Sequence, residues 1–162
     1  MKIIARQTLC ELSTAAASST RLRRNLNLHP SYADSVQRLF NAMEPGTYVR
    51  PHRHRESDKW ELFLVLSGAV AVISFDDLGK VTKRIELTTE GPILGIEIPE
   101  GTWHTLVALV PGTVVFECKR GPYQPLTDKD FAVWAPQEGD PKAAVFVAWF
   151  RQAAIGHIPP PA

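Results

Sequence analysis

The stretch PGTYVRPHRHRESDKWELFLVLSG, from Pro45 to Gly68, decides the fold because it joins a polar, histidine-bearing segment to a strongly apolar one. His52 and His54 stand one residue apart, and the apolar run that follows holds a single glutamate, Glu61. Side chains two residues apart on a β-strand share one face of the sheet. We therefore expect both imidazoles to point the same way, toward a region whose sequence is otherwise typical of a buried strand.

Short segments with period-two alternation continue on both sides of this stretch. They predict a series of strands at residues 36–43, 47–50, 60–66, 69–75, 81–87, 93–98, 102–109 and 113–119. Turn sequences such as EPG, DDLG and PEG separate them. Short, closely spaced strands without intervening helices predict an all-β protein, built as an antiparallel sandwich or barrel.

The two ends of the chain depart from this pattern. Residues 8–19 are alanine-rich and predict a short leading helix, whereas residues 23–29 alternate like a further strand. After a proline-rich connector, residues 141–154 predict an amphipathic C-terminal helix. We expect one domain in three parts: an N-terminal helix and extension (1–35), the barrel (36–120), and a connector, helix and tail (121–162).

Composition narrows the class of protein. The chain has 162 residues and a formal net charge of +1, so no charge excess favours nucleic acid or an anionic membrane as partner. No segment approaches the roughly 20 apolar residues of a membrane-spanning helix. Cys10 and Cys118 form no CxxC pair, which favours a reduced cytoplasm over a disulfide scaffold or a structural zinc site. We expect a cytoplasmic protein.

A third histidine, His104, follows a Pro-x-Gly turn in IPEGTWHTL, and this turn would aim it inward at the mouth of a barrel. Imidazole nitrogens together with a carboxylate oxygen suit a divalent first-row transition metal, here iron, manganese, nickel or zinc. Magnesium and calcium would favour oxygen ligands alone. The residues therefore predict one transition metal per chain.

Two motifs resemble those of the cupin superfamily. The first contains Gly46, His52-Arg53-His54, Glu61 and Gly68, and the second is Pro99-Glu100-Gly101-Thr102-Trp103-His104. The resemblance implies a double-stranded β-helix, the jelly-roll barrel of cupins, with short N-terminal and C-terminal helices added. It also implies that one metal is bound inside the barrel by His52, His54, Glu61 and His104.

Two departures from the cupin pattern matter. The gap before Glu61 is longer than usual, so Glu56 and Asp58 are alternative acidic ligands. Glu61 is favoured because it keeps the usual spacing to Gly68 and opens the apolar strand. Ala108 stands where the second motif usually has asparagine, and this change concerns the chemistry of the pocket rather than the metal.

Segments along nearly the whole chain, among them VQRLFNAMEPGTYVRPHRH, KWELFLVLSG, EIPEGTWHTLVAL and DKDFAVWAPQEG, resemble the WbuC-type cupin-fold metalloproteins. This resemblance implies a setting in O-antigen or surface-polysaccharide (lipopolysaccharide) biosynthesis. The leading hypothesis is a metal-dependent enzyme acting on a small-molecule substrate, a sugar or sugar nucleotide, as an isomerase or epimerase. The alternatives are an iron-dependent dioxygenase and a non-catalytic, metal-dependent sugar-binding module.

Three further residues are candidates for the pocket. Tyr48 and Arg50 have the same strand parity as the two histidines, so both are expected to face the interior. Arg50 would either hold an anionic group or form a structural salt bridge. Glu117 shares a strand face with Lys119, as an internal ion pair near the metal or as part of a solvated face. Glu117 or Tyr48 would move a proton.

A homodimer is also expected. The segment WELFLVL is apolar on both faces, so it needs cover on two sides, and the C-terminal helix does not suffice for both.

Overall fold

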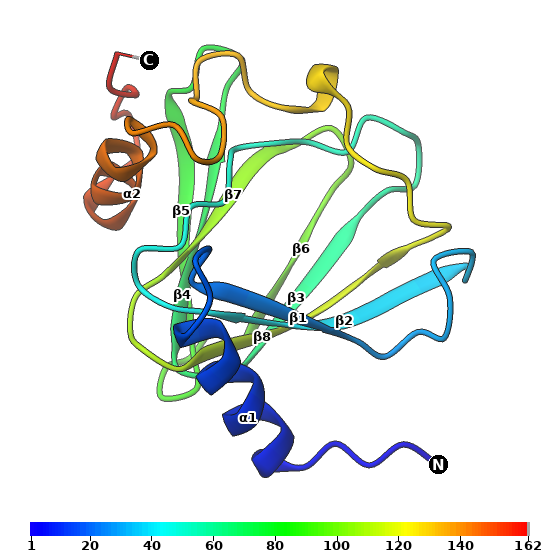
Figure 1. Ribbon diagram of the computed structural model, residues 1–162. Coiled ribbons are helices and arrows are strands. Elements are labelled where there is room, and N and C mark those ends of the chain that lie inside the picture. The colour runs from blue at the N-terminus through cyan, green and yellow to red at the C-terminus, as the bar shows by residue number, and fades with distance from the viewer. Residues whose placement is uncertain (162) are drawn as a thin grey trace.

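The predicted strands form two antiparallel sheets in the computed structural model, which describes residues 1–161 (Figure 1). One sheet has five strands in the order β1-β2-β8-β3-β6, and the other has three in the order β5-β4-β7. The strands are β1 (Arg23–Asn27), β2 (Val36–Met43), β3 (Glu61–Ser67), β4 (Ala69–Phe75), β5 (Val81–Thr88), β6 (Gly95–Ile98), β7 (Trp103–Ala108) and β8 (Thr113–Arg120). The helices are α1 (Arg6–Ala17) and α2 (Ala143–Gln152), with a short 3₁₀ helix η1 (Asp128–Asp130) in the connector.

The inner faces of the two sheets enclose the main core. In β3 the buried positions alternate with more exposed ones, so that Glu61, Phe63 and Val65 point inward while Leu64 and Leu66 point outward. Phe63 and Val65 pack with inward residues of the other sheet, such as Val70 and Val72, as period-two alternation requires. Glu61 is thus the polar end of an otherwise apolar inward row.

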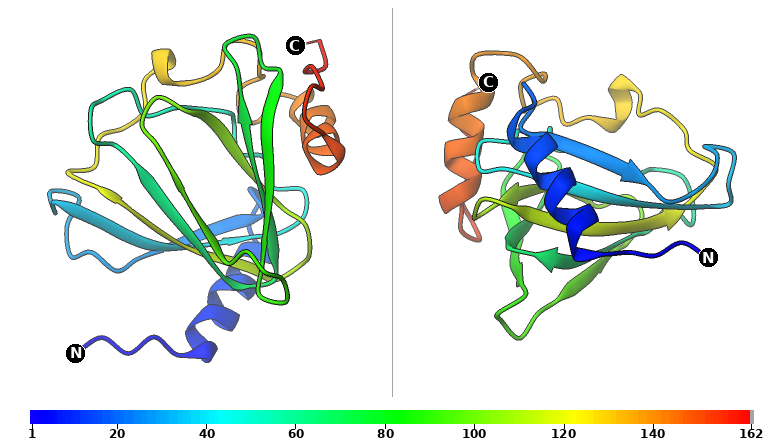
Figure 2. Two further views of the ribbon diagram at one scale, coloured as in Figure 1. Left: turned by 180° about the vertical axis from the view of Figure 1, so that it is seen from behind. Right: turned by 60° about the horizontal axis from the view of Figure 1, so that its bottom comes forward.

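The two helices cover the outside of the sheets (Figure 2). Helix α2 packs Phe146 and Phe150 against Ile73 and Phe75 on the outer face of the three-stranded sheet. Helix α1 lies against β1 and β2 and contributes Ala16 to a smaller cluster. Both predicted helices are therefore confirmed, with ends shifted by a few residues.

The predicted strand at residues 47–50 is wrong. This segment is extended but joins no ladder with any described strand, because its backbone groups have other partners: the Thr47 N–H donates to the Glu44 carbonyl at 3.0 Å, and the Val49 carbonyl accepts from the Thr105 hydroxyl at 2.6 Å. Pro51, which has no N–H to donate, follows at once. Strand-like pairing resumes only at His52, which forms isolated bridges with His104 and Phe131.

Among the residues that the structure describes, no helix is both long and apolar enough to cross a membrane.

Candidate metal centre

The structure brings together His52, His54, Glu61 and His104, each offering one ligand atom, and these atoms all lie within 4.8 Å of one another. Two backbone hydrogen bonds create the core of this cluster: the His52 N–H donates to the His104 carbonyl at 3.0 Å, and the His104 N–H donates back at 2.9 Å. Their ring centroids are 4.5 Å apart. The start of β7 and the segment before β3 thus meet at one end of the barrel.

Glu61 is the first residue of β3, and its side chain follows the inward parity of that strand. Its Oε1 lies 3.1 Å from His54 Nε2, and its Oε2 lies 2.9 Å from His104 Nε2. The residue is only 2% exposed. Glu61 is therefore the carboxylate of the cluster.

The two alternative acidic residues lie elsewhere. Glu56 pairs with Lys59 at 3.5 Å, and its side chain is 54% exposed. Asp58 forms an ion pair with Arg120, also near the surface. Both residues belong to the loop between His54 and Glu61, and neither is part of the cluster.

Two of the histidines are oriented by backbone carbonyls. His52 Nδ1 lies 3.0 Å from the Arg50 carbonyl oxygen, and His104 Nδ1 lies 2.9 Å from that of Thr102. A carbonyl oxygen only accepts, so in each ring Nδ1 carries the hydrogen and Nε2 offers its lone pair to the cluster. Such backbone hydrogen bonds are the usual way in which proteins hold metal-binding imidazoles.

The fit of the cluster to a metal can be judged from its unpaired atoms. His54 Nε2, His104 Nε2 and Glu61 Oε2 are buried and have no hydrogen-bond partner among the described residues while the imidazoles are neutral, because His104 Nε2 then turns a lone pair toward Glu61 Oε2 at 2.9 Å. Each such atom costs about 1–3 kcal/mol if left unpaired, so three at one place form a costly group. A divalent cation would satisfy all three. The three nitrogens and one oxygen suit a divalent first-row transition metal and leave its identity open.

The charges in the cluster also favour a cation. Burial raises the pKa of the Glu61 carboxyl, but Lys119 and the neighbouring imidazoles outweigh burial and hold this pKa well below its usual value. Burial lowers the pKa of His52 to about 3, so this imidazole stays neutral. Burial also acts to lower the pKa of His104, yet contact with Glu61 outweighs it and raises this pKa. A proton on His104 therefore competes with a metal for the same carboxylate.

An ion-pair chain extends from Glu61 into the barrel. Lys119 Nζ lies 2.9 Å from Glu61 Oε1 and 2.6 Å from Glu117 Oε1. Asn41 donates a hydrogen bond to the other oxygen of Glu117, which is 7% exposed. Of the two interpretations of Glu117 and Lys119, the structure therefore supports the internal ion pair.

Sequence reasoning missed two polar residues of this interior, Gln37 and Asn41. Both lie on β2, which pairs Gln37 with Lys119 and Asn41 with Val115 of β8. They share inward parity with Met43, a core residue. The available signal was a pair of amides on a strand face that is otherwise apolar.

The expected orientation of Tyr48 is wrong, and Arg50 is held by the connector. The Tyr48 hydroxyl donates to the Pro136 carbonyl at 2.7 Å, so this side chain lies against the connector and α2 instead of the cluster. The Arg50 guanidinium donates to the carbonyls of Ala132 and Ala135 and makes no salt bridge with any residue of the described chain. The parity argument failed because residues 47–50 are not in a strand.

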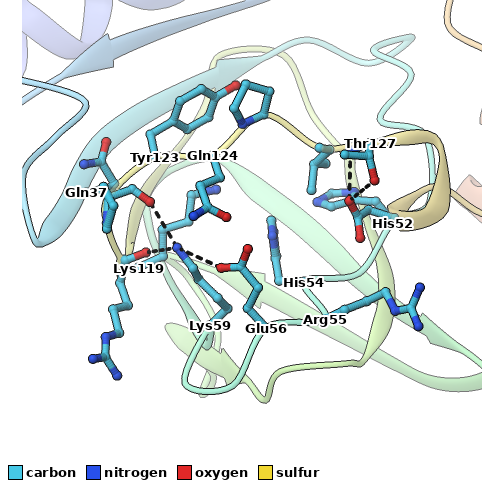
Figure 3. Close-up of a pocket in the computed structure, with 15 residues that line it drawn as sticks. Gln37, His52, His54, Arg55, Glu56, Lys59, Lys119, Tyr123, Gln124 and Thr127 are labelled. Carbon is cyan, nitrogen blue, oxygen red and sulfur yellow. Dashed lines mark hydrogen bonds and ion pairs between the residues drawn. The ribbon is translucent and has the colours of Figure 1, made fainter.

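Three cavities within residues 1–161 have a residue of the cluster in their lining. One, of about 460 Å³, is lined by His52 together with Arg50 and Phe131. The other two are each lined by two residues of the cluster. An outer cavity of about 210 Å³ is lined by His52 and His54 on one side and by residues 122–127 of the connector on another (Figure 3). An inner cavity of about 150 Å³ is lined by His52, Glu61, Glu117 and Asn41. A small molecule in either one would lie beside the proposed metal ligands.

Comparisons with known proteins show the fold. A family described as "Domain of unknown function (DUF6016)" matches residues 4–87, while curated proteins give no match. KdgF from Halomonas sp. is similar in structure, with 18% identity and a TM-score of 0.50 over 66% of this chain and 85% of that one. A cupin superfamily protein from Desulfitobacterium hafniense DCB-2 has 16% identity and a TM-score of 0.50 over 67% of this chain and 86% of that one.

A third similar structure is oxalate oxidase in complex with the substrate analogue glycolate, with 17% identity and a TM-score of 0.52 over 67% of this chain and 56% of that one. At sequence identities this low, the similarity shows a shared fold and nothing about activity. The predicted cupin barrel is confirmed, and the four clustered residues lie on that fold.

Proposed function

This chain belongs to the DUF6016 family, a domain of unknown function, and we propose that it is a metal-dependent enzyme that acts on a sugar or sugar nucleotide as an isomerase or epimerase. The observation that carries the metal-dependent part is the group of three buried, unpaired ligand atoms within one cluster of three histidines and a glutamate. The sugar and its setting in surface-polysaccharide biosynthesis rest on the resemblance to the WbuC-type proteins.

The proposed chemistry divides between the metal and the protein. A bound divalent metal would supply Lewis acidity that polarises a carbonyl or hydroxyl oxygen. Glu117 lines the inner cavity together with His52 and Glu61, so its carboxylate is placed to take or return a proton there. Lys119 holds both carboxylates by its two ion pairs. Tyr48 is not part of this proposal, because its hydroxyl is bound by the connector.

The anion-holding role expected of Arg50 is also set aside. Its Nε and one terminal nitrogen donate to backbone carbonyls, and its guanidinium carbon lies 5.1 Å from the centre of the Phe131 ring. Through these contacts, Arg50 holds the connector against the segment that carries His52. Arg50 lines a cavity that includes His52 but neither the outer nor the inner cavity, so a role in substrate binding is sought among the residues that line those two.

The first test is elemental analysis of protein purified without a metal-affinity tag, beside a His52→Ala/His104→Ala variant. We expect about one transition metal per chain in the wild type and its loss in the variant. A wild type that folds normally and holds no metal at all would contradict the proposal.

The second test is an assay of metal-loaded protein with nucleotide sugars and simple sugars, read by proton NMR for a change in stereochemistry. A change that disappears in a Glu117→Gln variant would support the isomerase or epimerase. Oxygen uptake that needs ferrous iron would instead establish the dioxygenase alternative. Thermal stabilisation by saccharides without any turnover would establish the binding module.

A further inference from the structure

The outer cavity contains a second group of side chains, on the side away from His52. Figure 3 shows Gln37 and Tyr123 on this far side, with His54 between them and His52. Gln37 belongs to β2 and Tyr123 to the connector, so neither element carries a residue of the metal cluster. The cavity therefore has one end formed by imidazoles and another formed by an amide and an aromatic ring.

Gln37 offers an unused hydrogen-bond acceptor. The residue is 2% exposed, and its Nε2 donates to the carbonyls of Tyr32 and Asp34 at 3.2 and 2.9 Å. These two bonds fix the direction of the amide, and its Oε1 is buried without a partner among residues 1–161. A buried acceptor of this kind is satisfied by a ligand that brings an O–H or N–H group.

Tyr123 offers an aromatic surface beside this acceptor. Its backbone N–H donates to the Tyr32 carbonyl at 2.7 Å, and the two rings pack with centroids 5.0 Å apart. Tyr123 remains 46% exposed and Tyr32 60% exposed. The face of an aromatic ring carries the negative end of its quadrupole, so it attracts the polarised C–H groups on one face of a sugar ring.

The cations around the outer cavity are largely neutralised. Lys59 pairs with Glu56, Arg120 pairs with Asp58, and Lys119 pairs with two buried carboxylates. Among the described residues that line the cavity, Arg55 is the one cation without a salt bridge. A nucleoside diphosphate bound at the far side, away from a metal held by His52 and His54, would bring at least two negative charges to a place with little positive charge to meet them.

From these contacts we infer that the far side of the outer cavity, formed by Gln37 and Tyr123, binds an uncharged saccharide ring. One hydroxyl donates to Gln37 Oε1, and the ring packs on the exposed part of Tyr123. This inference rests on the proposed function and narrows its substrate class from sugars and sugar nucleotides to neutral sugars.

The test is saturation-transfer NMR on the full chain with the methyl glycosides of glucose, galactose, mannose and N-acetylglucosamine, and with uridine diphosphate and uridine. We expect binding of at least one glycoside, and dissociation constants weakened roughly three- to tenfold in Tyr123→Ala. Tyr123→Phe keeps the ring and should bind nearly as the wild type does. Val133→Ala, at a residue 89% exposed and outside the cavity, is the surface control.

A Gln37→Leu variant tests the acceptor independently, with circular dichroism to verify its fold. We expect it to lose glycoside binding while the metal content of the same sample stays unchanged. Binding of uridine diphosphate but of no glycoside would overturn the inference, as would the absence of any binding. An equal loss in Tyr123→Phe and Tyr123→Ala would also overturn the packing on the ring. A wild type without metal that still binds a glycoside would refute the proposed function and leave this subsite standing.

Discussion

Replacing Lys119 by methionine should strongly destabilise the metal-free protein. The ammonium lies 2.9 Å from Glu61 Oε1 and 2.6 Å from Glu117 Oε1. Those carboxylates belong to residues only 2% and 7% exposed, so water can replace the lost partner only in part. Methionine nearly keeps the length and volume of the side chain and removes only its charge.

The magnitude follows from burial. Removing one member of a buried ion pair costs about 3–5 kcal/mol, since the other member is left as an uncompensated charge. The Lys119 side chain is 21% exposed toward the outer cavity, so some water can enter and we expect a value near the lower end, about 3 kcal/mol. That is a large part of the roughly 5–15 kcal/mol by which a domain is stable.

The assay is urea unfolding of metal-free protein at neutral pH, followed by tryptophan fluorescence. With a slope of about 1–3 kcal/mol per molar urea, the midpoint should fall by about 1–3 M. Lys83→Met is the matched control, because Lys83 lies exposed on β5 and has no ion pair with any described residue. A second variant, Lys119→Met/Glu117→Gln, should recover part of the lost free energy of unfolding, because only one buried carboxylate is then left without its cation.

The reasoning would be refuted if Lys119→Met and Lys83→Met differed by less than about 0.5 kcal/mol, the range of ordinary surface substitutions. It would also fail if the double variant were less stable than Lys119→Met alone.

Three further outcomes are expected. Gly68→Ala should lower the free energy of unfolding by about 2 kcal/mol or more, because φ at Gly68 is +71° and the added Cβ would lie 2.6 Å from Thr113 Oγ1. Thermal unfolding measures this, and an unchanged midpoint temperature would contradict it. The hydrogen bond from Arg21 holds the pKa of Glu138 below its usual 4.5 against the opposing effect of burial. The stabilisation of the folded state by this ion pair is therefore present above about pH 4.5 and is lost as pH falls through the folded pKa. It is about 0.5–1 kcal/mol, since the two side chains are 58% and 39% exposed, and the stability difference between wild type and Glu138→Gln should disappear at low pH. Finally, sedimentation at micromolar concentration should show a homodimer, and a monomer there would contradict the expectation drawn from the apolar outer face of β3.

Most of the strand order along the chain was predictable from alternation. The inward row of Glu61, Phe63 and Val65 is visible in the sequence as every second residue of the apolar run. Residues 47–50 alternate in the same way but form no strand, because strand formation needs a neighbouring backbone to pair with. Alternation records which side chains could face a core and says nothing of whether a partner strand lies beside them.

The candidate metal ligands were also predictable, since spacing along the chain and the chemistry of imidazole and carboxylate both point to His52, His54, Glu61 and His104. Of the three acidic candidates, spacing along the chain favours Glu61 over Glu56 and Asp58, and the structure places Glu61 alone in the cluster. The orientations predicted for Tyr48 and Arg50 depend on strand parity that extends through Pro51, and the structure has no strand there.

The sequence by itself determined the repeating two-residue pattern, the turns and the residue types that suit a transition metal, since these depend on local geometry and on side-chain chemistry. Only the tertiary structure decided which distant groups meet. It placed Lys119 between Glu61 and Glu117, turned the Tyr48 hydroxyl to the Pro136 carbonyl, and left Gln37 Oε1 unpaired beside Tyr123. Such contacts depend on the pairing of β2 with β8 and on the path of the connector, and no spacing within one segment records them.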